Sequence, residues 1–195
     1  MPILSIRFDE ALCFASEIHR QQTRKSTAIP YLTHLMAVSS LVGEHGGDED
    51  QMIAALLHDA MEDQDVTRQE IEQRFGKRVA DIVEGCTDAT EHPKPPWRQR
   101  KERYLAHLPE ASPDTKLVSV ADKLHNARSI LLDFRIIGPE IWTRFNAGAD
   151  ELLWYYSSLI QAFRKNWQHP LVDELERVIN QIMEIRRGKQ GVGQH

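Results

Sequence analysis

Apolar residues recur every three or four positions along most of the chain, which is the pattern of helices that bury one face. Phe8, Ala11, Leu12, Ala15 and Ile18 show this spacing near the start. With polar N-cap residues and terminating glycines or prolines, it predicts helices over 8–19, 33–44, 67–76, 78–86, 97–107, 138–145, 149–165 and 170–187, and two more that begin near 48 and 113. No segment alternates as a strand would. We therefore expect an all-α fold, a single helical bundle over residues 1–187 with a disordered tail at 188–195.

Histidine and aspartate interrupt the apolar runs at three places. His58 and Asp59 stand side by side in the run ALLHDAMED, His34 lies in PYLTHL, and Asp122 lies in LVSVADKL. Burying such groups against a core is costly unless a partner compensates them. Imidazole and carboxylate ligands suit a divalent ion of intermediate hardness, and the lack of cysteine ligands argues against a closed structural zinc site. We expect these four residues to hold one divalent metal ion between helices.

Two further carboxylates, Glu62 and Asp63, follow the His58–Asp59 pair. On a continuous helix they lie one turn beyond it and share its surface. A carboxylate so placed can accept a proton from an attacking water or return it to a leaving oxygen. The alternative is an ordinary solvated helix end, where acidic residues are frequent. Beside a metal site we favour the catalytic interpretation.

Length and charge narrow the class of protein. The chain has 195 residues, which suits one domain, and its net charge of −5 provides no positive field for a nucleic acid. No stretch approaches the roughly twenty apolar residues that span a membrane. Cys13 and Cys86 are isolated in apolar helical contexts, which predicts buried free thiols. We expect a cytoplasmic protein that needs neither nucleic acid nor membrane; its oligomeric state is not encoded in any pattern we recognise.

The order and context of these motifs resemble the HD-domain metal-dependent phosphohydrolases. In more detail the chain resembles the RelA/SpoT-type (p)ppGpp hydrolase domain and the small stand-alone SpoT homologues. The similar segments begin at residue 22 (QTRK), residue 30 (PYLTH), residue 55 (ALLHDAMED), residue 87 (TD, then RQRK from 98) and residue 116 (KLVSVADKLHNAR). The metal and substrate motifs span about residues 24–128.

The resemblance implies roles for individual residues. It implies Mn²⁺ as the ion, although the ligand types leave iron and zinc open. It assigns Arg24 to the base of a nucleotide, Lys25 and Arg128 to phosphate charge, and Asn126 to the sugar or a phosphate. The implied activity is removal of the 3′-pyrophosphate from guanosine-3′,5′-bis(diphosphate), a small-molecule nucleotide.

Two departures from the family pattern leave the substrate open. The glycine that precedes the Pro-Tyr pair is absent, with residues 26–29 (STAI) in its place, and Trp142–Asn146 has no residue-by-residue match. The aromatic run Trp154–Tyr156 could line a base pocket but fits a core stripe better. Two alternatives therefore stand beside the main hypothesis: an HD-domain nucleotidase or phosphohydrolase acting on another small phosphorylated metabolite, and a non-catalytic alarmone-binding protein.

Overall fold

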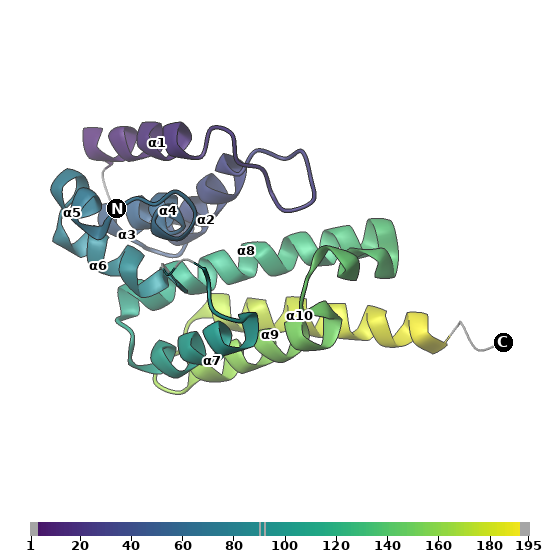
Figure 1. Ribbon diagram of the computed structural model, residues 1–195. Coiled ribbons are helices and arrows are strands. Elements are labelled where there is room, and N and C mark those ends of the chain that lie inside the picture. Colours follow the sequence, from purple (N-terminus) through teal and green to yellow (C-terminus); the bar gives the residue numbers. More distant parts are fainter. Residues whose placement is uncertain (1–3, 90, 92, 192–195) are drawn as a thin grey trace.

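A computed structural model describes residues 4–89, 91 and 93–191. Most of these residues lie in helices and none lies in a β-strand, which confirms the all-α prediction (Figure 1). The elements are α1 (Ile6–Ile18), α2 (Leu32–Glu44), α3 (Glu49–Leu57), α4 (Ala60–Asp63), α5 (Arg68–Phe75), α6 (Lys77–Cys86), α7 (Trp97–His107), the 3-10 turn η1 (Leu108–Glu110), α8 (Pro113–Ile137), the 3-10 turn η2 (Gly138–Arg144), α9 (Gly148–Arg164) and α10 (Pro170–Gly191).

Side-chain caps explain why several helices begin where they do. Asp48 accepts from the amide of Gln51, whose side chain accepts from the amide of Asp48, so a complete capping box opens α3. Ser112 caps α8 through the amide of Thr115, with Pro113 at the first helical position. These are the polar N-cap signals visible in the sequence.

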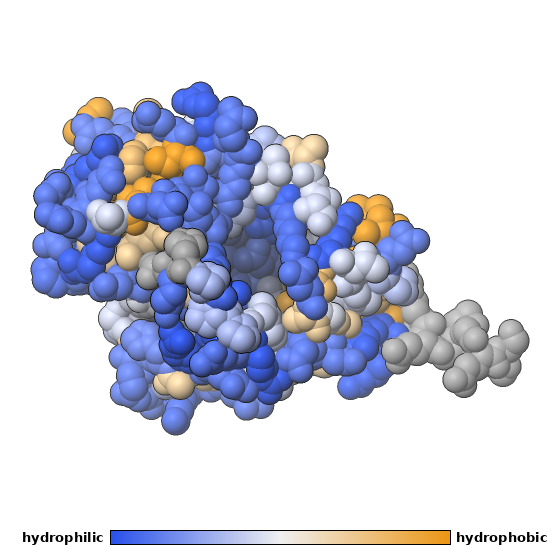
Figure 2. Space-filling model, in the orientation of Figure 1, coloured by the Kyte–Doolittle hydropathy of each residue, from blue (hydrophilic) through white to orange (hydrophobic). Residues whose placement is uncertain are grey.

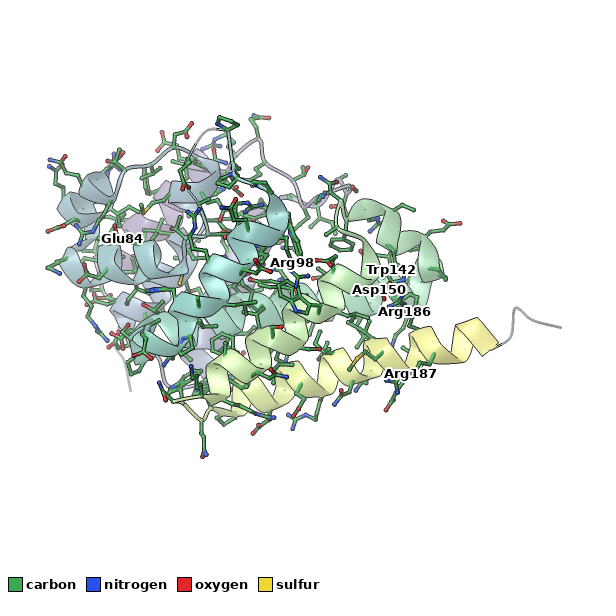
Figure 3. All side chains as sticks on the ribbon, turned by 60° about the horizontal axis from the view of Figure 1, so that its bottom comes forward. Glu84, Arg98, Trp142, Asp150, Arg186 and Arg187 are labelled. Carbon is green, nitrogen blue, oxygen red and sulfur yellow. The ribbon has the colours of Figure 1, made fainter. Side chains whose placement is uncertain are left out.

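The long helix α8 lies between two groups of helices (Figure 1). The helices α1 to α6 gather on one side of it, and α7, α9 and α10 lie on the other. It packs directly against α2, α3, α6 and α10. Its buried residues run from Thr115 to Phe134 and face all directions, as expected of a helix surrounded by protein. The ion pair between Asp150 and Arg186, visible in Figure 3, joins the start of α9 to α10.

The sequence predicts one continuous helix through His58 and Asp59, but the structure interrupts the helix at these two residues. It ends at Leu57, Asp59 adopts φ −102° and ψ 1°, and α4 begins at Ala60. The Nδ1 of His58 donates to the Ala55 carbonyl oxygen at 2.8 Å, so a side chain competes for an acceptor of the helix. This bridge-region conformation is frequent at functional sites. The consequence is a turn that aims His58 and Asp59 inward.

Two smaller predictions are also corrected. The helix α10 continues through Gly191 and does not end at 187, because one glycine costs about 1 kcal/mol, which does not end a helix by itself. Residues 192–195 lie outside the described part. Both cysteines are free thiols, as predicted, but Cys13 is exposed because it lies on the outer face of α1. Burial raises the pKa of the Cys86 thiol to about 11. No helix of the described chain is long and apolar enough to cross a membrane.

Candidate metal centre and adjoining cavity

Three segments bring the four predicted ligands together. His34 lies in α2, His58 and Asp59 form the turn after α3, and Asp122 lies in the middle of α8. The Nε2 of His34 is 3.2 Å from Asp122 Oδ1 and 4.0 Å from Asp59 Oδ2. The Nε2 of His58 is 3.1 Å from Asp59 Oδ2 and 3.6 Å from Asp122 Oδ1. We call these four residues the His–Asp cluster.

The donor atoms of the His–Asp cluster fit a metal ion. His34 is fully buried and His58 is 3% exposed. Yet within the described chain the Nε2 atoms of both are buried without a hydrogen-bond partner, although carboxylate oxygens lie close by. One ligand atom from each of His34, His58 and Asp59 lies within 4.8 Å of the others. Two bare imidazole nitrogens that face two carboxylates are costly unless a cation lies between them.

Hydrogen bonds on the outer side orient both histidines. The Nδ1 of His58 donates to the Ala55 carbonyl oxygen, which leaves Nε2 without its proton when the ring is neutral. The Nδ1 of His34 lies 2.8 Å from the Nδ1 of His125, a residue that the sequence did not single out. Such outer contacts fix the tautomer and the direction of a metal-binding imidazole.

The carboxylates of the cluster are held in the same way. Asp59 Oδ2 accepts from the Tyr31 hydroxyl at 2.5 Å. Asp122 accepts from Lys123 Nζ at 2.6 Å through Oδ2 and from Asn126 Nδ2 at 2.5 Å through Oδ1. Asn126 reaches Asp122 because residues four apart share a helix face, as predicted. Every ligand therefore has a second contact that fixes its direction.

The charges within the cluster balance one another. Burial alone would raise the pKa values of Asp59 and Asp122, but the cations of His58 and Lys123 keep both below the usual range for aspartate. Burial alone would lower the pKa of His58, but the two carboxylates raise it well above its ordinary value. Burial lowers the pKa of His34. A proton on His58 thus compensates the carboxylates, in the place where a divalent cation would do so.

Glu62 and Asp63 lie at the edge of the cluster, on α4. The Nζ of Lys94 is 3.0 Å from Glu62 Oε1 and 3.7 Å from Asp63 Oδ1. Their side chains are 19% and 29% exposed, so neither is a freely solvated helix end. Burial, together with the nearby Asp59 carboxylate, raises the pKa of Asp63.

A hydrogen-bonded chain behind Asp63 was missed by the sequence analysis. The buried His19 contacts Gln22 Oε1 through Nδ1 at 2.5 Å, and Gln64 Nε2 donates to the same oxygen at 2.7 Å. With its oxygen so occupied, Gln22 donates from Nε2 to Asp63 Oδ2 at 2.8 Å. Gln22 belongs to a family motif, but nothing in the local sequence pattern indicates His19 as its partner.

A cavity of about 540 Å³ adjoins the cluster. Four of its lining residues, Tyr31, Lys123, His125 and Asn126, are the ones that contact the cluster directly. Figure 2 shows a hollow near the centre of the displayed face with largely hydrophilic surroundings. The remaining walls come from residues 24–33, α7, the second half of α8, residues 141–145 and α9.

The predicted substrate contacts divide into two groups. Arg24, Lys25 and Asn126 line the cavity. Arg128 is not among the described lining residues, and its guanidinium pairs with Glu174 of α10. The reason is helical geometry: residue 128 is two positions after 126, which turns it to a different face of α8. In this conformation Arg128 does not line the cavity, and its predicted contact to a phosphate stays a prediction.

Other lining residues had only weak signals in the sequence. Lys101 and Lys123 belong to the motifs that resemble the family, but the sequence predicted no contact for either side chain. In the structure both residues line the cavity. Burial lowers the pKa of the Lys101 ammonium, with Lys123 acting in the same direction. Tyr155 lines it too, whereas its neighbour Trp154 stacks under Arg98, which Figure 3 labels.

The segments that departed from the family pattern both border the cavity. Ser26, in the stretch without the expected glycine, takes φ 58°, a left-handed conformation that is uncommon for a residue other than glycine. The loop still closes, because the Arg24 amide donates to the Ile29 carbonyl oxygen at 2.8 Å. From the unmatched Trp142–Asn146 stretch, Arg144 and Phe145 line the far wall. Both segments that differ from the family pattern therefore contribute to the shape of the cavity.

Comparison with known proteins places this geometry in a family. A family model described as an HD domain matches residues 11–146. The chain belongs to the HD domain family, which confirms the resemblance inferred from the motifs. It is 42% identical over 137 residues to the guanosine-3′,5′-bis(diphosphate) 3′-pyrophosphohydrolase MESH1 of Xenopus tropicalis, covering 69% of this chain and 73% of that protein.

Two further relatives extend the likeness over nearly the whole chain. MESH1 of Mus musculus is 34% identical over 180 residues, covering 91% of this chain and 93% of that protein. A solved structure described as a metazoan ortholog of SpoT that hydrolyses ppGpp aligns with a TM-score of 0.76 and 26% identity, covering 93% of this chain and 98% of the other.

Proposed function

We propose that this protein is a metal-dependent phosphohydrolase that removes the 3′-pyrophosphate from guanosine-3′,5′-bis(diphosphate). The observation that carries the proposal is the pair of bare Nε2 atoms of His34 and His58, which face Asp59 and Asp122 beside a cation-lined cavity. Relatives that cover most of this chain carry that activity in their names.

His34, His58, Asp59 and Asp122 hold the ion in this proposal. Bound there, a divalent metal supplies Lewis-acid polarisation of a phosphoryl oxygen and lowers the pKa of water. Mn²⁺ suits a mixed set of nitrogen and oxygen ligands, and its preference for six ligands leaves room beside four protein groups.

Glu62 and Asp63 transfer the proton between the attacking water and the leaving oxygen in this proposal. Lys94 Nζ lies 3.0 Å from Glu62 Oε1 and 3.7 Å from Asp63 Oδ1. The Asp88 amide donates to Glu62 Oε2 at 3.4 Å and Gln22 Nε2 donates to Asp63 Oδ2 at 2.8 Å, so neighbours hold both carboxylates at the edge of the cluster. The raised pKa of Asp63 favours its protonated form, so Asp63 can return a proton to the leaving oxygen, and the Glu62 carboxylate can accept one from the attacking water.

The cations of the cavity bind the phosphates. Lys101 and Lys123 are half-buried in the cavity wall, and an anion placed in the cavity relieves the charge repulsion between them. Arg24 offers a planar guanidinium for a purine face, Lys25 contributes phosphate charge, and Asn126 reaches the sugar or a phosphate. We further propose one domain over residues 1–187 that works in the cytoplasm, with no nucleic acid or membrane as partner.

Turnover of a nucleotide panel tests the proposal. Purified protein is given ppGpp, NADPH and ordinary nucleoside phosphates with Mn²⁺, then after chelation, and with Fe²⁺ or Zn²⁺ in place of Mn²⁺. We expect pyrophosphate release from ppGpp with Mn²⁺ and none after chelation. Robust hydrolysis of another nucleotide without ppGpp turnover contradicts the substrate and favours the nucleotidase alternative. Tight ppGpp binding without any turnover favours the alarmone-binding alternative.

A further inference from the structure

A second imidazole stands behind the buried ligand His34. The Nδ1 of His125, on α8, lies 2.8 Å from the Nδ1 of His34, and the two ring centroids are 4.8 Å apart. His34 has no exposed surface, whereas His125 lines the cavity. His125 therefore links a buried residue of the cluster to the space where a ligand binds.

The hydrogen bond between the two rings defines their tautomers. The Nε2 of His34 faces Asp122 and Asp59 without a hydrogen-bond partner, so its ligand form carries no proton there. A neutral His34 then carries its proton on Nδ1 and donates it to Nδ1 of His125. His125 must accept through Nδ1, which leaves its own proton on Nε2.

We infer that His125 has two roles: it positions His34 as a metal ligand, and its Nε2–H is a hydrogen-bond donor for an anionic oxygen of the ligand in the cavity. The inference rests on the proposed function, because it takes His34 as a ligand of the ion. His125 touches no ion itself and acts on the metal only through His34. The adjacent residue Asn126 has a parallel arrangement, since it lines the same cavity and contacts Asp122.

Two substitutions separate the two roles. In His125→Asn the side-chain oxygen takes the place of Nδ1 and still accepts from His34, but the donor at the Nε2 position is gone. In His125→Phe both are gone. We expect His125→Phe to weaken Mn²⁺ binding by about 10–100-fold, the range for loss of an outer contact to a ligand. We expect His125→Asn to keep the wild-type affinity for Mn²⁺ and to raise KM with kcat little changed.

The measurements are direct titration of Mn²⁺ and ¹⁵N NMR of the His34 ring in protein with diamagnetic Zn²⁺. The matched control is His107→Phe, the same change at an exposed histidine of α7. Wild-type Mn²⁺ affinity in folded His125→Phe overturns the positioning role, as does a His34 ring protonated on Nε2. Wild-type KM in His125→Asn overturns the donor role.

The outcomes also separate this inference from the proposed function. If wild-type protein binds Mn²⁺ but does not turn over ppGpp, the substrate assignment fails while the affinity comparison still decides the positioning role. If His125→Phe does not fold, as judged by circular dichroism, the ring tautomer in wild-type protein decides that role instead.

Discussion

The His–Asp cluster and the cavity wall lie side by side but are built on different principles. Side chains of the cluster are 0% exposed at His34, 3% at His58 and 8% at Asp122, and each contacts a protein group that fixes its direction. The wall collects Arg24, Lys25 and other cations from segments far apart in the sequence. The cluster is therefore organised before any ligand arrives, whereas the wall has charge that a ligand can satisfy.

The largest effect should come from the cluster. Asp122→Ala removes the oxygen that faces both imidazoles and leaves Lys123 Nζ and Asn126 Nδ2 without their acceptor. We expect loss of the bound ion, a fall of turnover to background, and a lower Tm because the stabilisation by metal binding is lost. Elemental analysis and a thermal melt check this, with exposed Asp81→Ala as control. Full metal occupancy in Asp122→Ala would contradict the ligand assignment.

An intermediate effect is expected where the cluster meets the cavity. Asp63→Asn keeps the shape and the contact to Gln22 but removes the carboxylate that carries the proton. We expect unchanged metal content and a kcat lower by on the order of 10²–10⁴-fold, the range for a lost general acid or base. Steady-state kinetics on metal-replete protein measure it, with Asp65→Asn, two residues away, as control. A kcat in Asp63→Asn equal to that of the wild type would mean that Asp63 has no role in catalysis.

The smallest effect should come from the wall. Arg24→Ala removes a contact remote from the reacting phosphorus, so binding in the ground state and the transition state weakens equally. We expect KM to rise about tenfold, as for loss of a desolvated cation–π contact, with kcat nearly unchanged. Arg128→Ala is the matched control, because its guanidinium pairs with Glu174 outside the cavity. Equal effects of the two variants would mean that the cavity does not define the substrate site.

The difference between the two regions also explains what the sequence could predict. His34, His58, Asp59 and Asp122 were recognisable because each interrupts an apolar helical run, and the structure brings all four together. The helices themselves followed from apolar spacing and caps. The break after Leu57 was not predictable, because it depends on the His58 side chain competing for the Ala55 carbonyl oxygen.

The cavity wall was less accessible to sequence analysis because its residues meet only through packing. Lys101 and Tyr155 come from α7 and α9, and no local pattern shows that these helices face the same space as Arg24. Arg128 also depends on packing: the family resemblance assigns it to phosphate charge, but it lies two residues after Asn126 on α8, and its guanidinium pairs with Glu174.

One consequence of the central helix α8 concerns how unevenly local stability is distributed within the site. Every residue of α8 from Thr115 to Asp122 is buried, and the helix packs against both groups of helices, so we expect these backbone amides to exchange hydrogen only when the whole domain unfolds. Asp122 lies in that slowly exchanging segment. Arg24 lies in the loop between α1 and α2, which is closed by only a few backbone hydrogen bonds, so local unfolding of this loop breaks few interactions. Protection from hydrogen exchange should therefore be high at Asp122 and lower in the loop that carries Arg24, although both residues belong to one site.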